Sequence, residues 1–177
     1  MKQLIVIIGP NGAGKSTTAR NIVERYENTA YVDSDWCRVM NPFNFTEITK
    51  ETIAQNIYSL LYNYLSCDVI NTVIFTYGWH GARKEIYEKV IGKLKSAKLD
   101  FEEKIVILKC SKEENIKRAI NDGRNEERVK RGMDLTFAFY DEYAYPMIDT
   151  TDMIPSRVAD RIMDFVKEQR HMIFAEQ

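Results

Sequence analysis

Short apolar stretches that suggest buried strands alternate along the chain with amphipathic stretches that suggest helices. The apolar stretches predict five strands, at residues 4–8, 29–32, 68–76, 104–110 and 146–149. Apolar residues at helical spacing predict six helices, at residues 16–26, 47–66, 81–97, 112–121, 134–144 and from 155 onward. This alternation is typical of an α/β fold, in which a parallel sheet with right-handed crossovers carries helices on its faces.

Composition and charge narrow the class of protein. A length of 177 residues with 45% hydrophobic content suits one domain, so we expect residues 1–177 to form a single unit. A net charge of -1 and a pI near 6.2 argue against nucleic acid as a partner. Cys37, Cys67 and Cys110 are widely spaced, which predicts reduced thiols. No signal peptide or membrane span is expected, and a cytoplasmic location fits these features.

One local motif stands between the first predicted strand and the first predicted helix. Its residues follow the pattern G-x-x-x-x-G-K-S/T, and they are Gly9, Pro10, Asn11, Gly12, Ala13, Gly14, Lys15 and Ser16. Glycines let the backbone turn its N–H groups toward phosphate oxygens, and the start of a helix adds partial positive charge. A chance match in a chain of this length has odds of about one in a hundred. The motif therefore predicts a phosphate-binding loop for ATP.

The motif also assigns individual roles. Lys15 is expected to lie along the β- and γ-phosphates as a catalytic cation, and the Ser16 hydroxyl is expected to hold Mg²⁺. Thr17, the next residue, is expected among the nucleotide contacts.

An acidic segment follows the second predicted strand. Ligands of parallel sheets bind at the carboxyl ends of the strands, so Asp33 and Asp35 are expected to face the phosphate loop. We take 33–66 as the acceptor region. The two carboxylates are expected to alternate along an extended segment and point to opposite sides. Asp35 is assigned to the acceptor hydroxyl and Asp33 to the Mg²⁺ hydration shell, with the reverse assignment left open.

These residues favour phosphoryl transfer over simple hydrolysis. The transition state places charge on three equatorial oxygens, so the protein must supply cations, and an acceptor hydroxyl needs a carboxylate nearby. Lys15, Mg²⁺ and the arginine-rich residues 123–132 would supply the cations, with Arg124 and Arg128 assigned to catalysis in a mobile segment. Trp79 follows the third strand and is a candidate to line the acceptor pocket, whereas His80 is expected to be an ordinary loop residue.

On these motifs the chain resembles the small P-loop kinases, the group with adenylate, shikimate and gluconate kinases, chloramphenicol phosphotransferase and phage polynucleotide kinase. The resemblance implies a three-layer fold, a five-stranded parallel sheet of order 2-3-1-4-5, and a lid at about 122–133. It also implies that Arg118 stacks on adenine, with Pro155 in the adenine-side loop. Asp35-x-x-Arg38 is similar to the acid and arginine that hold the acceptor in polynucleotide kinase.

The sequence also departs from the patterns of other nucleotide-binding proteins. The third strand lacks the terminal aspartate of a Walker B motif, so metal support must come from Asp33, Thr76 or water. The Leu-Ser-Gly-Gly signature of ABC transporter ATPases and the Asn-Lys-x-Asp motif of GTPases are both missing.

The leading prediction is an ATP-dependent phosphotransferase that acts on a hydroxyl of a small molecule, nucleoside-like or sugar-like. Three alternatives stay open: a nucleoside monophosphate kinase, a regulatory ATPase or nucleotide switch, and a polynucleotide 5′-hydroxyl kinase. The sequence does not indicate the oligomeric state.

Overall fold

The computed structural model of the chain describes residues 1–123, 127, 129–130 and 136–175. Its described residues contain one parallel sheet in the order β2-β3-β1-β4-β5, which confirms the predicted topology. The strands, in chain order, are β1 (Lys2–Ile8), β2 (Thr29–Asp33), β3 (Thr72–Thr76), β4 (Phe101–Lys109) and β5 (Met147–Asp149).

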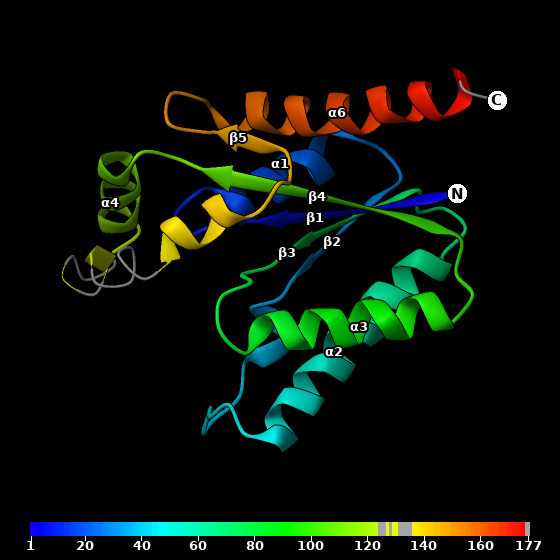
Figure 1. Cartoon of the computed structure of the whole chain (residues 1–177), viewed down its shortest axis with the longest axis horizontal. Coiled ribbons are helices and arrows are strands. Elements are labelled where there is room, and N and C mark those ends of the chain that lie inside the picture. Colours follow the sequence, from blue (N-terminus) through cyan, green and yellow to red (C-terminus); the bar gives the residue numbers. More distant parts are fainter. Residues whose placement is uncertain (124–126, 128, 131–135, 176–177) are drawn as a thin grey trace.

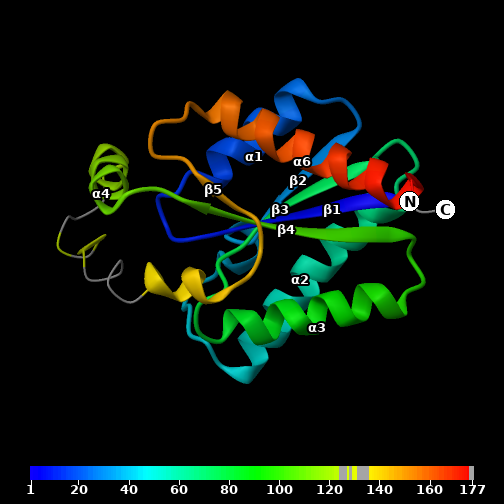
Figure 2. The same cartoon turned by 45° about the horizontal axis from the view of Figure 1, so that its top comes forward.

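Helices cover both faces of this sheet, as predicted. In Figures 1 and 2, α1 and α6 lie on one face and α2 and α3 on the other, whereas α4 lies beyond the carboxyl end of β4. The helices are α1 (Lys15–Arg25), α2 (Glu47–Ser66), α3 (Arg83–Ser96), α4 (Lys112–Asn121) and α6 (Pro155–Ala175), with short 3-10 helices η1 (Trp36–Arg38) and η2 (Ala138–Glu142).

The central strand β1 divides the hydrophobic core into two clusters. Leu4, Val6 and Ile8 pack with α2 and α3, while Ile5 and Ile7 pack with α1 and α6. All five side chains are completely buried, because successive residues of a strand point to opposite faces and helices cover both. Burial of each such side chain contributes about 1.5–3 kcal/mol. The core therefore holds β1 rigidly, and with it the loop at its carboxyl end.

Most element boundaries agree with the sequence-based expectations, and the bounds of α2 agree in full. Thr46 caps α2 through a reciprocal capping box with Thr49. Ser111 caps α4, since its hydroxyl accepts a 3.1 Å hydrogen bond from the Glu114 amide.

Several boundaries were predicted wrongly. β3 begins at Thr72 rather than at residue 68, because the chain turns through a hydrogen bond from the Ile70 amide to the Cys67 carbonyl. β4 begins at Phe101 rather than at residue 104, because its first residues pair with β1. The helix predicted at 134–144 contains the 3-10 helix η2 in its described part. α6, predicted to begin at residue 155, extends from Pro155 to Ala175.

Within the described part of the chain, every helix is too short or too polar to cross a lipid bilayer.

Candidate active site

The loop between β1 and α1 depends on glycine backbone conformations. Gly9, Gly12 and Gly14 have φ angles of 142°, 85° and 90°, a region that other residues rarely adopt. A Cβ atom on Gly9 would lie 2.1 Å from the carbonyl oxygen of Leu108 in β4, so the loop packs directly against the neighbouring strand. The glycines of the motif are therefore required by the local geometry.

Side chains hold the carbonyl oxygens of this loop. Lys15 Nζ donates 2.9 Å hydrogen bonds to the carbonyl oxygens of both Gly9 and Pro10. Its ammonium group thus lies against the loop, at the start of α1. Because carbonyl oxygens repel phosphate oxygens, a cation placed over two of them makes the loop more favourable for an anion.

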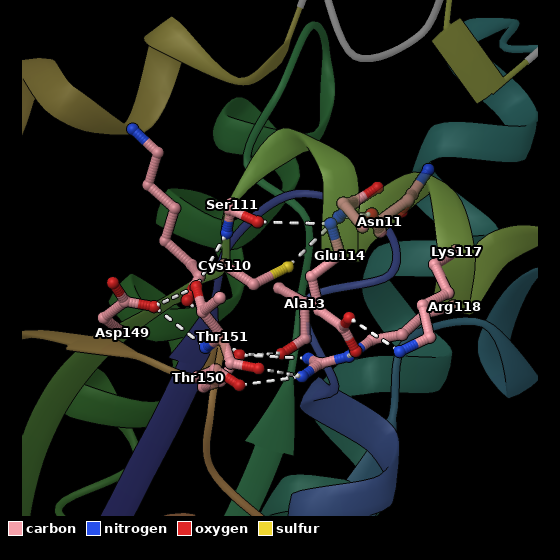
Figure 3. A network of polar contacts seen from close by, with 12 residues as sticks. Asn11, Ala13, Cys110, Ser111, Glu114, Lys117, Arg118, Asp149, Thr150 and Thr151 are labelled. Atoms are coloured by element: carbon pink, nitrogen blue, oxygen red, sulfur yellow. Dashed lines mark hydrogen bonds and ion pairs between the residues drawn. The ribbon is translucent and has the colours of Figure 1, made fainter.

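Two buried residues from distant parts of the chain, Asn115 and Thr150, complete this arrangement, and Figure 3 shows Thr150 beside Ala13. Asn115 of α4 donates through Nδ2 to the carbonyl oxygen of Asn11 at 2.7 Å. Thr150, which follows β5, donates through Oγ1 to the carbonyl oxygen of Ala13 at 3.2 Å. Asn115 and Thr150 are only 1% and 2% exposed. The loop conformation is therefore supported by α4 and by the segment after β5.

Arg118 joins α4 to the segment after β5 (Figure 3). Its Nε pairs with Glu114 at 2.9 Å, and its Nη2 donates to the carbonyl oxygens of Thr150 at 2.7 Å and Thr151 at 3.3 Å. These contacts hold the plane of the guanidinium at the side of the cavity where Pro155 also lies. A planar, fixed cation of this kind suits stacking on an aromatic base.

Ser16 and Asp33 come together at the start of α1 and the end of β2. Ser16 Oγ donates to Asp33 Oδ2 at 2.9 Å, and the hydroxyl of Tyr31 donates to the same oxygen at 2.6 Å. The Tyr31 hydroxyl also contacts Thr76 Oγ1 at 3.1 Å. Oxygen donors, with one carboxylate among them, fit Mg²⁺, which takes few protein ligands and keeps several waters. The residues present therefore suit this ion.

Asp35 lies apart from Asp33, but not for the predicted reason. β2 ends at Asp33, and the chain then turns, with the Asp35 amide donating to Asp33 Oδ1 at 3.0 Å. Asp35 precedes the 3-10 helix η1 in a helical conformation, so the expected alternation along an extended segment is wrong. Asp33 is 7% exposed, whereas the Asp35 side chain is 67% exposed and forms an ion pair with Arg38.

A cavity of about 330 Å³ connects these groups. It is lined by residues from the loop, from the ends of β2 and β3, and from the segment after β5. The predicted site residues that line it are Asn11, Gly12, Ala13, Gly14, Lys15, Ser16, Thr17, Asp33, Asp35, Arg118 and Pro155. Residues that are far apart in sequence thus meet at the carboxyl edge of the sheet, as expected for a parallel α/β fold.

Several solved structures with a similar fold are described as kinases. A gluconokinase from Sinorhizobium meliloti 1021 aligns with a TM-score of 0.66 at 12% identity, over 99% of this chain and 97% of its own. A shikimate kinase from Acinetobacter baumannii, in complex with shikimate, aligns with a TM-score of 0.60 at 19% identity, over 96% and 95%. The APS kinase of Mycobacterium tuberculosis, in complex with AMPPNP and APS, aligns with a TM-score of 0.60 at 16% identity, over 94% and 98%.

This chain has the fold of the small P-loop kinases. At the level of sequence, no protein-family model and no curated protein matches it.

Four of the predicted site residues that the structure describes do not line this 330 Å³ cavity, which we call the P-loop cavity. Gly9 and Pro10 lie behind it and present their carbonyl oxygens to Lys15. Arg38 lines a small adjoining recess. Trp79 is 3% exposed, and its indole packs against Tyr87 and other aromatic rings on a separate surface.

The two catalytic arginines predicted in the lid, Arg124 and Arg128, lie outside the described residues. Their assignment remains a prediction.

The sequence-based reasoning missed Arg83, which lines the cavity, and its contact with His80. Arg83 begins α3 and lines the P-loop cavity. Its Nη1 lies 2.9 Å from Nε2 of His80. Because a guanidinium can only donate, His80 must accept at Nε2, which fixes the neutral tautomer with its proton on Nδ1. The sequence feature that could have pointed to Arg83 is the glycine at position 78, because a Cβ there would lie 3.1 Å from Arg83 Nη1.

His80 is kept uncharged by its surroundings. Burial foremost, and then the positive charges of Arg83, Lys15 and Arg38, lower its pKa to about 4. Its Nδ1 is buried without a partner, so His80 is not an ordinary loop residue. The positive charges of Arg83, Lys15 and Arg38 therefore act together on His80.

Proposed function

We propose that this protein is an ATP-dependent phosphotransferase that moves the γ-phosphoryl group of ATP to a hydroxyl group of a small molecule. The observation that carries the proposal is that Asp35 lines the same cavity as Lys15 and Ser16 of the phosphate loop. A carboxylate within reach of a phosphate site is the arrangement that transfer to an alcohol requires. The structural likeness to gluconokinase, shikimate kinase and APS kinase supports the same class of reaction.

The nucleotide side is assigned to the loop and to α4. Backbone N–H groups of residues 11–16 would bind the phosphates, with Lys15 moving from the carbonyl oxygens of Gly9 and Pro10 onto phosphate oxygens. Arg118 and Pro155 would flank the adenine. Arg118 is already held by Thr150, so little ordering is needed when the base binds.

Mg²⁺, when bound, neutralises charge on the phosphates and helps to orient them. The Ser16 hydroxyl is the proposed protein ligand, and Asp33 the proposed acceptor of hydrogen bonds from the ion's water shell. The buried position of Asp33 and its bond from Ser16 support this assignment over the reverse one. Thr76, next to Asp33 in the β2–β3 register, offers a second hydroxyl where a Walker B carboxylate is missing.

Asp35 is the proposed general base. Its carboxylate would orient the acceptor hydroxyl and accept its proton as the acceptor oxygen bonds to the γ-phosphorus. The bond between that phosphorus and the β–γ bridging oxygen breaks, and ADP leaves with the electron pair. Lys15 and the predicted Arg124 and Arg128 would offset the charge that develops on the transferred group. Asp35 supports this role because it is exposed to the cavity, whereas Asp33 is enclosed.

The decisive experiment is phosphoryl transfer from [γ-³²P]ATP with Mg²⁺ to a panel of small hydroxyl compounds, sugars and nucleosides. The proposal predicts that label appears in a phosphate monoester. Nucleoside monophosphates are added in a parallel reaction, in which label in a nucleoside diphosphate would instead support a nucleoside monophosphate kinase. ATP binding without transfer to any compound would contradict the proposal and favour a regulatory ATPase.

Two variants sharpen this test. Lys15→Ala should abolish transfer while the chain stays folded, because Lys15 lies in the loop and outside the core. Asp35→Asn should lower kcat by about 10²–10⁴-fold, the usual contribution of a general base, with the affinity for ATP unchanged. Loss of ATP binding in Asp35→Asn would mean that Asp35 serves the metal.

A further inference from the structure

A second cavity, of about 460 Å³, is separate from the P-loop cavity. Its walls come from α3, from β4, from residues 143–145 before β5, and from Trp79 after β3. Among the residues that the structure describes, none lines both cavities. Small-molecule sites in proteins have volumes of roughly 300–1,000 Å³. The second cavity can therefore hold a small molecule that is not the phosphoryl acceptor.

The cavity lies along a part of β4 that β5 does not cover. β5 pairs with β4 only at residues 107–109, and β4 continues well beyond β5 in Figure 1. Among the described strands, none pairs with residues 101–106 on that side. Glu103 and Ile105 line the cavity instead. The short last strand of the sheet thus leaves room for a ligand between β4 and α3.

Four aromatic side chains line this cavity, which we call the aromatic cavity, and they are Trp79, Tyr87, Tyr143 and Tyr145. The Trp79 ring meets Tyr143 and Tyr145 edge to face, with ring centroids 5.3 Å and 5.6 Å apart, and the two tyrosines stack on each other. Trp79 and Tyr87 are only 3% and 5% exposed, so packing fixes their rings. Fixed aromatic rings favour a ligand that is itself a flat ring.

Lys84 brings a positive charge to the aromatic cavity. Its ammonium group lies 5.1 Å from the centroid of the Tyr143 ring and 5.9 Å from that of Trp79. Within the described part of the chain, no carboxylate forms an ion pair with it. The aromatic faces attract the ammonium group and hold it at the cavity. An anionic group on a ligand would supply the missing partner.

The acidic residues of the lining do not take that place. Glu103 already pairs with Lys95 at 3.1 Å and accepts a hydrogen bond from the Tyr87 hydroxyl. Burial foremost, and then the charge of Glu103, raise the pKa of Tyr87, so this hydroxyl keeps its proton and remains a donor. Glu88 is exposed to solvent. Lys84 therefore remains the cation available to a ligand.

The indole of Trp79 adds a hydrogen-bond donor. Its Nε1 is buried and has no acceptor in the described part of the chain. An indole N–H can only donate, and leaving it unpaired in the interior is unfavourable. An oxygen acceptor on a ligand would pair with it.

We propose that the aromatic cavity is a second ligand site and binds a small aromatic carboxylate, with the ring among Trp79 and the tyrosines and the carboxylate at Lys84. A single ammonium group matches the single charge of a carboxylate. The site does not depend on phosphoryl transfer, so its test is independent of the proposed function.

The first test observes the Trp79 indole directly. ¹H–¹⁵N NMR spectra of the labelled chain contain one indole signal for each of Trp36 and Trp79, and Trp36→Phe assigns the signal of Trp79. Benzoate is added up to about 10 mM at constant pH and ionic strength. The proposal predicts a saturable shift of the Trp79 signal. A spectrum without such a shift would overturn it.

Analogues of benzoate separate the ring from the charge. Benzamide keeps the ring without the charge, and cyclohexanecarboxylate keeps the charge without the aromatic ring. Each should bind at least about tenfold more weakly than benzoate, because each lacks one of the two interactions. Benzylamine, with the opposite charge, should give no saturable shift. The proposal would be wrong if benzamide or benzylamine bound as tightly as benzoate.

Lys84→Met tests where the carboxylate binds. The variant should raise the Kd of benzoate about tenfold and leave the Kd of benzamide unchanged. Lys89→Met, on the same helix, is the matched control and should change neither Kd, because Lys89 pairs with Glu51 of α2. An equal Kd of benzoate in wild type and Lys84→Met would overturn the assignment of the anion to Lys84.

Tyr145→Ala tests where the ring binds. Tyr145 is 38% exposed, so its removal should leave the chain folded, which the melting temperature checks. The Kd values of benzoate and benzamide should both rise about 2- to 10-fold, the usual range for one aromatic contact. Unchanged binding of both compounds would place the ligand outside the aromatic cavity and contradict the proposal.

Discussion

Asn115 Nδ2 donates a 2.7 Å hydrogen bond to the carbonyl oxygen of Asn11, so a residue of α4 holds the phosphate loop more than one hundred positions away in sequence. The amide is buried, and it also limits the space beside the loop, since a Cβ on Gly12 would lie 3.0 Å from it. The proposed binding of a nucleotide at the loop would therefore depend on the position of α4.

Asn115→Ala tests this dependence. The variant leaves the Asn11 carbonyl without its donor, a loss of about 1–2 kcal/mol. We expect the Kd for Mg²⁺-ATP to rise about tenfold by isothermal titration calorimetry. Asn121→Ala, at an exposed position near the end of the same helix, is the control and should leave the Kd unchanged. A variant that melts earlier but binds ATP normally would contradict the role of Asn115 in the loop.

Asp33→Asn tests the division of labour between the two aspartates. Asp33 accepts hydrogen bonds from Ser16 and Tyr31, and its amide analogue is a weaker partner for Mg²⁺ and its waters. The Mg²⁺ concentration that gives half-maximal activity should rise about tenfold, with the acceptor KM unchanged. Asp35→Asn should give the opposite pattern, a loss of kcat at normal Mg²⁺ dependence. If Asp35→Asn changed the Mg²⁺ dependence and Asp33→Asn lowered kcat instead, the reverse assignment would hold.

Gly9→Ala should destabilise the fold strongly. The added Cβ would overlap the Leu108 carbonyl oxygen, 2.1 Å away on the rigid strand β4, at a φ of 142° that alanine disfavours. We expect a loss of about 2–5 kcal/mol in the free energy of unfolding, measured with urea. Gly92→Ala is the matched control in α3, where a Cβ meets nothing within 4 Å. It should stabilise the chain by about 0.5–1 kcal/mol, because alanine favours helix.

The low pKa of His80 predicts a pH-dependent stability. In the unfolded chain its pKa returns to about 6.5, so between roughly pH 4 and 6.5 the unfolded state binds the extra proton. The contribution of neutral His80 to the free energy of unfolding is therefore fully present above pH 6.5 and is lost as the pH falls toward 4. The loss should be about 2 kcal/mol, because one pKa unit corresponds to about 1.4 kcal/mol and partial exposure weakens the effect.

Urea unfolding at pH 4.5 and 7 measures this contribution. His80→Gln should reduce the difference between the two pH values, whereas His171→Gln should leave it in place. An equal pH dependence in wild type and His80→Gln would contradict the neutral state of His80 in the fold.

Local sequence predicted the elements and the position of the loop motif well. The loop motif is contiguous, so the order of its residues alone placed the glycines, Lys15 and Ser16. The apolar stripe of α2 is long, and it predicted both bounds of that helix correctly. Asp33 and Asp35 were correctly placed near the loop, because strand ends of a parallel sheet converge. Their separation was predicted for a wrong reason, since the turn after Asp33 depends on a side-chain hydrogen bond.

The acceptor side was predicted less well. Trp79 and Arg83 both follow β3 and lie four positions apart in the sequence. The sequence alone does not tell which of these side chains is buried in the core and which lines the cavity. In the structure Trp79 packs among tyrosines that include Tyr143, which comes from the segment before β5. Arg83 instead turns to the cavity, beside Gly78.

The sequence by itself determined the order of strands and helices along the chain and the place of the glycine-rich loop between β1 and α1. Both depend on hydrogen bonds and periodicity among residues that are neighbours along the chain. Only the tertiary structure decided which side chains after β3 face the cavity, and which residues of α4 and the segment after β5 support the loop. Those outcomes depend on packing between elements that are distant in sequence, where burial and the available volume select one side chain over another.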